Sequence, residues 1–335
     1  DTSDRVITLT ALKDSGGTAN GGDDTAALSV ASTVTVAGVN DEPTLTATGS
    51  NPAFTEGGAA GSLFSGTSIS TVEAGQTIEG LTLTVTNVAD GSSEIVNVDG
   101  TAIALTNGTS GTTATNSLSY SVSVSGTTAT LSLTGGTMST AAAQTLIDGM
   151  SYQNNSEAPD ISNRVVTLTA LKDSGGTANG GDDTVALAVA STVTVASVND
   201  EPTLTATGSN PTFTEGGTAG SLFTGTNIST VEAGQAIEAL TLTVTNVTNG
   251  SSEIVNLDGT AIALTNGTSG TTATNSLSYS VSVVGTTATL SLAGGAMSTA
   301  AAQTLIDSAS YQNTSSSPDT SDRVITLTAL KDSGG

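Results

Sequence analysis

The protein has 335 residues, of which 30 are acidic and 6 are basic, so its formal net charge is −24. This charge repels nucleic acid and anionic membranes, which excludes both as partners. The sequence contains no His and no Cys, so the usual general base, thiol nucleophile and zinc ligands are excluded as well. No apolar run is long enough to predict membrane insertion. Carboxylates remain as the groups that carry chemistry.

Short runs of alternating apolar and polar residues predict β-strands along the chain, because successive side chains of a strand point to opposite faces. Turn-forming pairs such as Asp99-Gly100 and Asn107-Gly108 separate these runs. In chain order, the predicted strands are Thr44–Thr48, Leu81–Val88, Glu94–Val98, Thr101–Leu105, Leu118–Val124, Ala129–Leu133, Arg164–Leu171 and Val185–Val195.

One segment has a helical pattern instead. Ser139-Thr140 resembles a capping-box start, the helix formers Ala141–Asp148 follow, and Gly149 ends the run. This predicts a short helix that crosses from one sheet to another. Eight or so short antiparallel strands with one helix predict an all-β, immunoglobulin-like sandwich whose core is built from small aliphatic side chains.

The chain repeats itself over a long period. Asp1–Val6 matches Asp160–Val165 and Asp319–Val324, which sets the period at 160 − 1 = 159 residues. Residues 1–159 and 160–318 differ at 23 positions, mostly by exchanges among small or polar residues. A period of this length corresponds to one whole domain rather than one coil of a solenoid. The sequence therefore predicts a tandem array of sandwich domains, each with one short helix.

A proline-containing segment marks the predicted joint between domains. The strand that begins at Ser32 runs into Asn40–Pro43, and the same arrangement returns at Asn199–Pro202. Proline lacks a backbone donor and restricts the residue before it to extended geometry, so strand pairing is interrupted there. The predicted domains are the last strands of one repeat at 1–38, a complete repeat at 39–197, and a repeat without its last strand at 198–335. These boundaries favour a window on a longer array over a subunit that exchanges strands with identical chains.

The last third of each repeat carries the most specific motifs. Leu146–Pro159, Arg164–Gly176 and Thr192–Pro202 resemble the cadherin-like and VCBS-type repeats of giant bacterial surface adhesins, many of which have RTX-type secretion signals. The resemblance implies cadherin-like sandwich domains that calcium stiffens into spacers outside the cell. It also implies that Asp200 and Glu201 are linker ligands. The family often has alanine before the proline, where this chain has glutamate.

Calcium takes six to eight oxygen ligands, so a site needs several acidic residues that converge from different loops. The candidates at the joint are Asp41, Glu42 and Glu56, with the loop of Asp14 or the pair Asp23-Asp24; Glu73 belongs to a second group with Glu94 and Asp99. Glu157 is set aside because the second copy has Ser316. The alternative is that these residues form ordinary turns and keep a surface protein soluble. The corresponding candidates one period later are Asp173, Asp182, Asp183, Asp200, Glu201, Glu215 and Glu232.

An enzymatic role is not expected, and no catalytic residue is predicted. Paired carboxylates could serve a glycosidase, but a sugar-binding cleft generally has aromatic platforms and the chain has no Trp. We expect extracellular spacer repeats of a bacterial surface adhesin or matrix protein, stiffened by Ca²⁺ and in contact with neighbouring repeats. The runner-up is a subunit of a filament, sheath or surface layer in which identical chains associate, and a carbohydrate-binding module is a weaker alternative.

Overall fold

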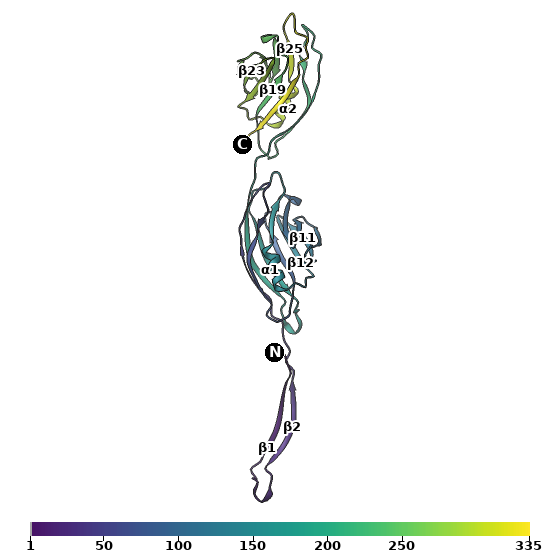
Figure 1. The fold of residues 1–335 in the computed structure, drawn as a ribbon, viewed down its shortest axis with the longest axis vertical. Coiled ribbons are helices and arrows are strands. Elements are labelled where there is room, and N and C mark those ends of the chain that lie inside the picture. The colour runs from purple at the N-terminus through teal and green to yellow at the C-terminus, as the bar shows by residue number, and fades with distance from the viewer. Residues whose placement is uncertain (1) are drawn as a thin grey trace. The chain divides into compact units, whose positions relative to one another are not determined.

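The predicted all-β class is confirmed by the structure, a computed structural model that describes residues 2–335. Strands form several antiparallel sheets, and the only helices in these residues longer than one turn are two short α-helices (Figure 1). The described chain divides into two compact units. Unit 1 contains the residues through Phe54 together with 59–154 and 162–195, and unit 2 contains 55–58, 155–161 and 196–335. The boundaries given above for the repeats stay a prediction.

Unit 1 holds a sandwich whose two largest sheets have seven and four strands. The larger sheet has the order β10-β11-β12-β7-β14-β15-β4, the smaller one has the order β5-β13-β8-β9, and β3 pairs with β6. The bounds are β3 Thr44–Gly49, β4 Ala53–Thr55, β5 Gly61–Ser62, β6 Phe64–Ser70, β7 Ile78–Val85, β8 Glu94–Val98, β9 Thr101–Ala104, β10 Ser110–Thr112, β11 Ser119–Ser125, β12 Thr128–Thr134, β13 Ser151–Asn154, β14 Arg164–Asp173 and β15 Thr184–Ala196.

The core of unit 1 is aliphatic and lies between these sheets. Leu83 and Leu131 from the larger sheet and Val96 from the smaller one are each 0% exposed. The solvent-facing positions of β12 are Ser and Thr, which alternate with the buried residues as the period of two requires. The prediction for β7 extended too far: the strand ends at Val85, because Asn87 adopts a positive φ of 59° that breaks the extended geometry.

Helix α1, Thr140–Asp148, links β12 of the larger sheet to β13 of the smaller one. The hydroxyl of Ser139 accepts a hydrogen bond from the Ala142 N–H at 3.2 Å, so Ser139 caps the helix. The capping box is incomplete, because Ala142 occupies the position at which a Glu or Gln side chain would accept a hydrogen bond from the Ser139 N–H. Leu146 and Ile147 are buried in the core. Helix α2, Thr299–Asp307, repeats this geometry with Ser298 as its cap.

Unit 2 repeats strand β3 and strands β5 to β14 of unit 1, each 159 residues later, except that β26 begins two residues after the position that corresponds to the start of β14. Its larger sheet has the order β22-β23-β24-β19-β26, so β26 lies at an edge, whereas its counterpart β14 is covered by β15. Thr212–Thr214, which correspond to β4, form no strand. The bounds are β16 Thr203–Gly208, β17 Gly220–Ser221, β18 Phe223–Ser229, β19 Ile237–Val244, β20 Glu253–Leu257, β21 Thr260–Ala263, β22 Ser269–Thr271, β23 Ser278–Val284, β24 Thr287–Ala293, β25 Ser310–Asn313 and β26 Ile325–Asp332.

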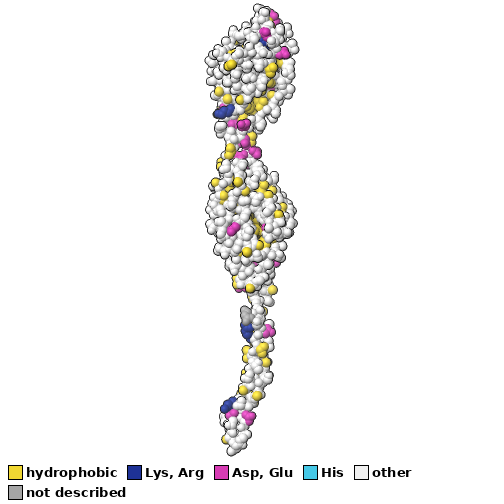
Figure 2. All heavy atoms as spheres, viewed as in Figure 1, with side chains coloured by type: hydrophobic (Ala, Val, Ile, Leu, Met, Phe, Trp, Pro, Cys, Tyr) yellow, Lys and Arg dark blue, Asp and Glu magenta, His cyan; other side chains and the backbone are white. Residues whose placement is uncertain are grey.

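The N-terminal residues form a separate two-stranded sheet of β1, Arg5–Lys13, and β2, Thr25–Val34. Every position of β1 is exposed, and Ile7, Leu9 and Val30 are each 60% exposed. Figure 2 shows hydrophobic side chains on the surface of this hairpin. The pairing register equals that of β14 with β15, including the bulge that follows Leu9 in β1 and Leu168 in β14. The hairpin thus has the same pairing as β14 with β15, and its apolar side chains are exposed.

Candidate cation site built from carboxylates and amides

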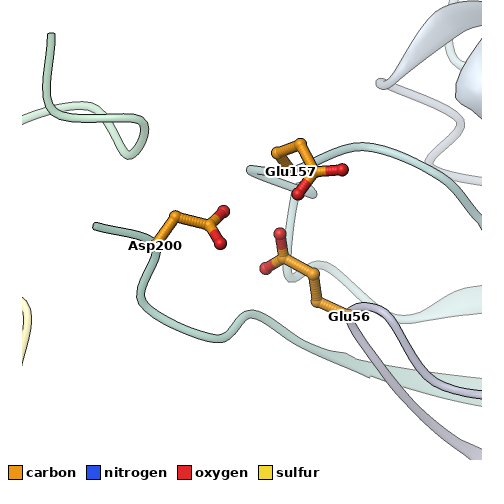
Figure 3. Close-up of side chains that lie close together, drawn as sticks. All are labelled: Glu56, Glu157 and Asp200. Carbon is orange, nitrogen blue, oxygen red and sulfur yellow. The ribbon is translucent and has the colours of Figure 1, made fainter. Parts of the chain in front are cut away.

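Three carboxylates converge in unit 2. Glu56 follows β4, Glu157 follows β13, and Asp200 follows β15; one carboxylate oxygen of each lies within 4.8 Å of the others. In Figure 3 the carboxylates of Glu56 and Asp200 point toward one another, and Glu157 lies beside them. Like charges at this separation repel by about 1 kcal/mol in water and by more near a protein surface. The arrangement therefore favours a positive charge in the space that they share.

The backbone holds Glu56 in this position. The Glu56 N–H donates to the Ala196 carbonyl at 2.9 Å, and the Val198 N–H donates to Glu56 Oε2 at 2.8 Å. Partial burial raises the pKa of Glu56, the Val198 N–H opposes this, and the charges of Asp200, Glu232 and Glu157 raise the pKa further. Burial and the neighbouring negative charges both disfavour the ionised form of Glu56, and a bound cation would favour it.

A fourth carboxylate, Glu232, joins the group through the backbone. The Asp200 N–H donates to Glu232 Oε1 at 3.1 Å. Glu56 Oε1, Asp200 Oδ2 and Glu232 Oε2 are buried, and each lacks a hydrogen-bond partner in the described structure. Buried polar atoms are rarely left unsatisfied in native proteins, so these oxygens are available to bind a cation or water.

The linker residue Asn199 connects this group to a second set of oxygens. Its amide donates to Asp332 Oδ1 at 3.4 Å and accepts from the Gln235 amide at 2.6 Å. Asp332 is only 2% exposed, and Asp332 Oδ2 and Gln235 Oε1 have no partner among the described residues. Five unpartnered oxygens thus lie in unit 2, three on the carboxylate group and two on the hydrogen-bond partners of Asn199.

Unit 1 contains the same network around Asn40. The Asn40 amide donates to Asp173 Oδ1 at 3.2 Å and accepts from Gln76, and Asp173 is 0% exposed. Asp173 Oδ2 and Gln76 Oε1 again lack partners in the described residues. The same two oxygens are unpaired in both units, although the two copies of the repeat differ at 23 positions. The unpaired oxygens are therefore a property of the residues that the two copies share.

Basic side chains of the described residues pair with carboxylates outside this group. Five of these basic residues form ion pairs with other acidic groups: Lys13 with Asp24, Arg164 with Asp90 and Glu94, Lys172 with Glu79 and Asp183, Arg323 with Glu253 and Asp319, and Lys331 with Glu238. The available donors are carboxylate and amide oxygens, which match a hard cation such as Ca²⁺. A transition metal that prefers nitrogen or sulfur finds no such ligand here.

The structure brings some of the predicted residues together and separates others. Glu56, Asp200 and Glu232 meet in unit 2, and Asp173 and Glu73 lie on the Asn40 network, where the Gln76 amide also donates to Glu73 Oε2 at 3.2 Å. The Asp41 N–H donates a hydrogen bond to Glu73 Oε2 at 3.4 Å, but the Asp41 side chain is exposed. The remaining exposed candidates are Glu42, Glu201, Glu215, Asp14, Asp23 and Asp182.

Several of the candidates that lie outside the carboxylate group accept hydrogen bonds within their own turns. Asp14 Oδ1 accepts from the Gly16 N–H at 2.8 Å, and Asp23 and Asp182 accept in the same way from Thr25 and Thr184. Asp24 pairs with Lys13 at 3.1 Å, and Asp183 with Lys172 at 3.6 Å. These contacts are those of ordinary turns and surface ion pairs, which is the alternative to metal binding that the sequence analysis describes. Asp99 does so too, because it accepts from Thr113 and Asn116 within a buried turn.

Sequence reasoning missed Glu157, the linker asparagines and the Gln76 and Gln235 amides. Glu157 was set aside because its counterpart is Ser316, so comparison of the two copies worked against it. Asn199 and Gln235 could have been found from the sequence, since both belong to segments that recur in the two copies, V-N-D-E-P and V-E-A-G-Q. No family model, curated protein or solved structure matches this chain.

Proposed function

We propose that this chain is a spacer segment of a large extracellular bacterial adhesin or matrix protein, and that Ca²⁺ stiffens the linkers between its sandwiches. The near-identity of the two copies supports a role that depends on length rather than on a unique active site. The outer strand positions are mostly Ser and Thr, and the acidic groups concentrate in loops. The described residues contain no helix of the length and apolarity that crossing a membrane requires.

The unpartnered oxygens of Glu56, Asp200 and Glu232 carry this proposal. An ionised carboxylate that is shielded from water without a cation or donor costs free energy, and here several such groups share one place. Calcium supplies the positive charge when it is bound. The side chains of Glu56 and Asp200 would hold the ion, and Glu157 would add a third carboxylate.

Stiffening follows from where these ligands stand along the chain. Asp200 is part of the linker that follows β15, and Glu56 already accepts from the Val198 N–H of the same linker. A ligand set that includes both residues ties the linker to the loop at Thr55–Gly58. Without the cation, the carboxylates repel and the linker loses this attachment.

Calcium binding is tested by calorimetric titration of the purified chain, together with thermal unfolding in Ca²⁺ and in chelator. A ligand that binds only the native state stabilises it by about 2.7 kcal/mol at a hundredfold excess over its Kd. We expect a higher melting temperature in millimolar Ca²⁺, and the loss of this increase in a Glu56→Gln, Asp200→Asn variant. Glu215→Gln, which changes an exposed carboxylate, is the matched control. Absence of binding heat together with identical melting curves would reject the proposal.

A further inference from the structure

Strand β14 of unit 1 ends on a buried acidic residue. Asp173 lies on the buried side of the strand and is 0% exposed, as Val166 and Leu168 are. The side chain of the preceding Lys172 is 44% exposed and lies 2.8 Å from Glu79. An ionised carboxylate at a buried position costs free energy unless donors or a cation compensate its charge. The partners of Asp173 therefore need to be accounted for atom by atom.

The hydrogen bonds of Asp173 involve one of its two oxygens. Oδ1 accepts from the Asn40 amide at 3.2 Å and from the Gly175 N–H at 3.0 Å. Oδ2 is buried and has no hydrogen-bond partner among the described residues. It stays unpartnered although the loop that follows β14 is bonded to the same asparagine, since the Asp182 N–H donates to the Asn40 carbonyl at 3.0 Å. One oxygen of a fully buried carboxylate is thus free to bind a ligand.

A second buried oxygen without a partner belongs to Gln76. Its neighbour Thr77 exchanges two hydrogen bonds with Ser174, at 2.9 Å and 3.0 Å, so Gln76 is held beside the end of β14. The Gln76 amide donates to Asn40 Oδ1 and to Glu73 Oε2. Gln76 Oε1 is buried and lacks a partner in the described chain. Both unpartnered atoms at this place are therefore acceptors, and a second carboxylate is bonded to the same amide.

We infer that unit 1 binds a calcium ion of its own, with Asp173 Oδ2 and Gln76 Oε1 as ligands and Glu73 as the second negative charge. Carboxylate and side-chain carbonyl oxygens are ligands that Ca²⁺ takes, and water completes its set of six to eight. Two carboxylates balance the charge of one divalent cation. The ion also fixes Asn40, the linker residue that is bonded to both ligands, against the loop at 174–183.

This site is separate from the one that carries the proposed function. That proposal rests on Glu56 and Asp200, which belong to unit 2. The residues of the new site recur in unit 2 as Asp332, Gln235 and Glu232, and Asp332 Oδ2 and Gln235 Oε1 are again unpartnered. Glu232 is shared with the carboxylate group there. Unit 1 is therefore the place at which the new site is tested without interference.

Amide hydrogen exchange of residues 174–183, measured on the full chain in Ca²⁺ and in chelator, tests the site. Ca²⁺ at about ten times its Kd should slow exchange in this loop about tenfold, because a ligand that binds only the closed state lowers the open population by that factor. Asp173→Asn keeps an oxygen that accepts from Asn40 and Gly175 but removes the charge, so it should abolish the response. Asp182→Asn is the matched control, because it makes the same change at an exposed carboxylate of this loop and should retain the response.

Two further measurements separate this inference from its alternatives. The Glu56→Gln, Asp200→Asn variant should lose the melting response that the carboxylate group confers but keep the slowed exchange of the loop. In chelator, Asp173→Asn should melt no lower than wild type, because it removes a buried charge that no cation then balances. Loss of the loop response in the first variant, or a lower melting temperature of Asp173→Asn in chelator, would overturn the inference. Equal exchange of wild type in Ca²⁺ and in chelator would do so too and would assign a buried water to these oxygens.

Discussion

Arg164 and Glu94 form a two-point ion pair inside the sandwich of unit 1. Arg164 Nε lies 3.0 Å from Glu94 Oε2, Arg164 Nη2 lies 2.8 Å from Glu94 Oε1, and both side chains are 0% exposed. The Tyr152 hydroxyl also donates to Glu94 Oε2 at 2.9 Å. Arg323, Glu253 and Tyr311 repeat the arrangement in unit 2. Arg164 thus lies in the interior of its sandwich, and Arg323 is nearly as buried, with 7% of its side chain exposed.

This ion pair predicts how stability depends on pH. Burial alone would raise the pKa of Glu94, but the hydrogen bonds from Arg164 and from the Asp90 and Ala89 N–H groups outweigh it, so the pKa is lowered. A lowered pKa in the folded state stabilises the fold above the unfolded value of about 4.3 and loses this contribution as the pH falls through the folded value. Glu94→Gln should cost about 3–5 kcal/mol at pH 7, because it leaves a buried guanidinium without its partner.

Urea unfolding at pH 7 and at pH 3 measures this effect. The difference in stability between wild type and Glu94→Gln should shrink at pH 3, which lies below the unfolded pKa, because unfolding of the wild type then takes up a proton at this carboxyl. Glu79→Gln is the control, because Glu79 pairs with Lys172 at 2.8 Å on the surface and both side chains are more than a third exposed. That change should cost less than about 1 kcal/mol. A difference for Glu94→Gln that is the same at both pH values would contradict the assignment.

The calcium proposal predicts different roles for two adjacent acidic residues of the linker. Asp200 belongs to the carboxylate cluster, whereas Glu201 is exposed. Small-angle scattering should show a longer maximum dimension in Ca²⁺ than in chelator, because the bound ion restrains the linker. Asp200→Asn should remove this difference, and Glu201→Gln should retain it. If both variants respond as the wild type does, the linker is restrained by packing instead.

The glycine after Asp332-Ser333 is predicted to be required for docking of the linker. A Cβ at Gly334 would overlap the amide groups of Asn199 and Gln235, and Gly175 has the same relationship to Asn40 and Gln76. Gly334→Ala should therefore destabilise unit 2 by about 1–3 kcal/mol, as overpacking does. Amide hydrogen exchange should show faster exchange around Asn199. Thr177→Ala, in the equivalent loop of unit 1 but exposed, should leave both measurements unchanged.

The cap of α1 gives a prediction about local stability. The Ser139 hydroxyl accepts from the Ala142 N–H, and no second cap contact from a Glu or Gln supports it. Ser139→Ala should lower the stability of unit 1 by about 1 kcal/mol, and Ser139→Asp should preserve it. Differential scanning calorimetry of the three proteins provides the comparison. Equal stability of wild type and Ser139→Ala would show that the helix is held by Leu146 and Ile147 alone.

Local pattern was enough to predict most of the secondary structure. All eight predicted strands occur, with shifts at their ends, because alternation and turn residues act within a few neighbours along the chain. The strands that were not predicted, such as β13 with its sequence Ser151–Asn154, are short and rich in polar residues. They become strands because neighbouring strands supply hydrogen-bond partners, a condition that their own residues do not reveal.

By itself, the sequence determined the repeat, the all-β class, the helix position and the restriction to carboxylate chemistry, since these depend on composition and local order. Only the tertiary structure decided which carboxylates meet. Glu56, Glu157 and Asp200 lie about a hundred and about forty residues apart in sequence, and the strand order places their loops together. It likewise decided that Arg164 is buried, because burial depends on what packs against a strand and not on the strand's own residues.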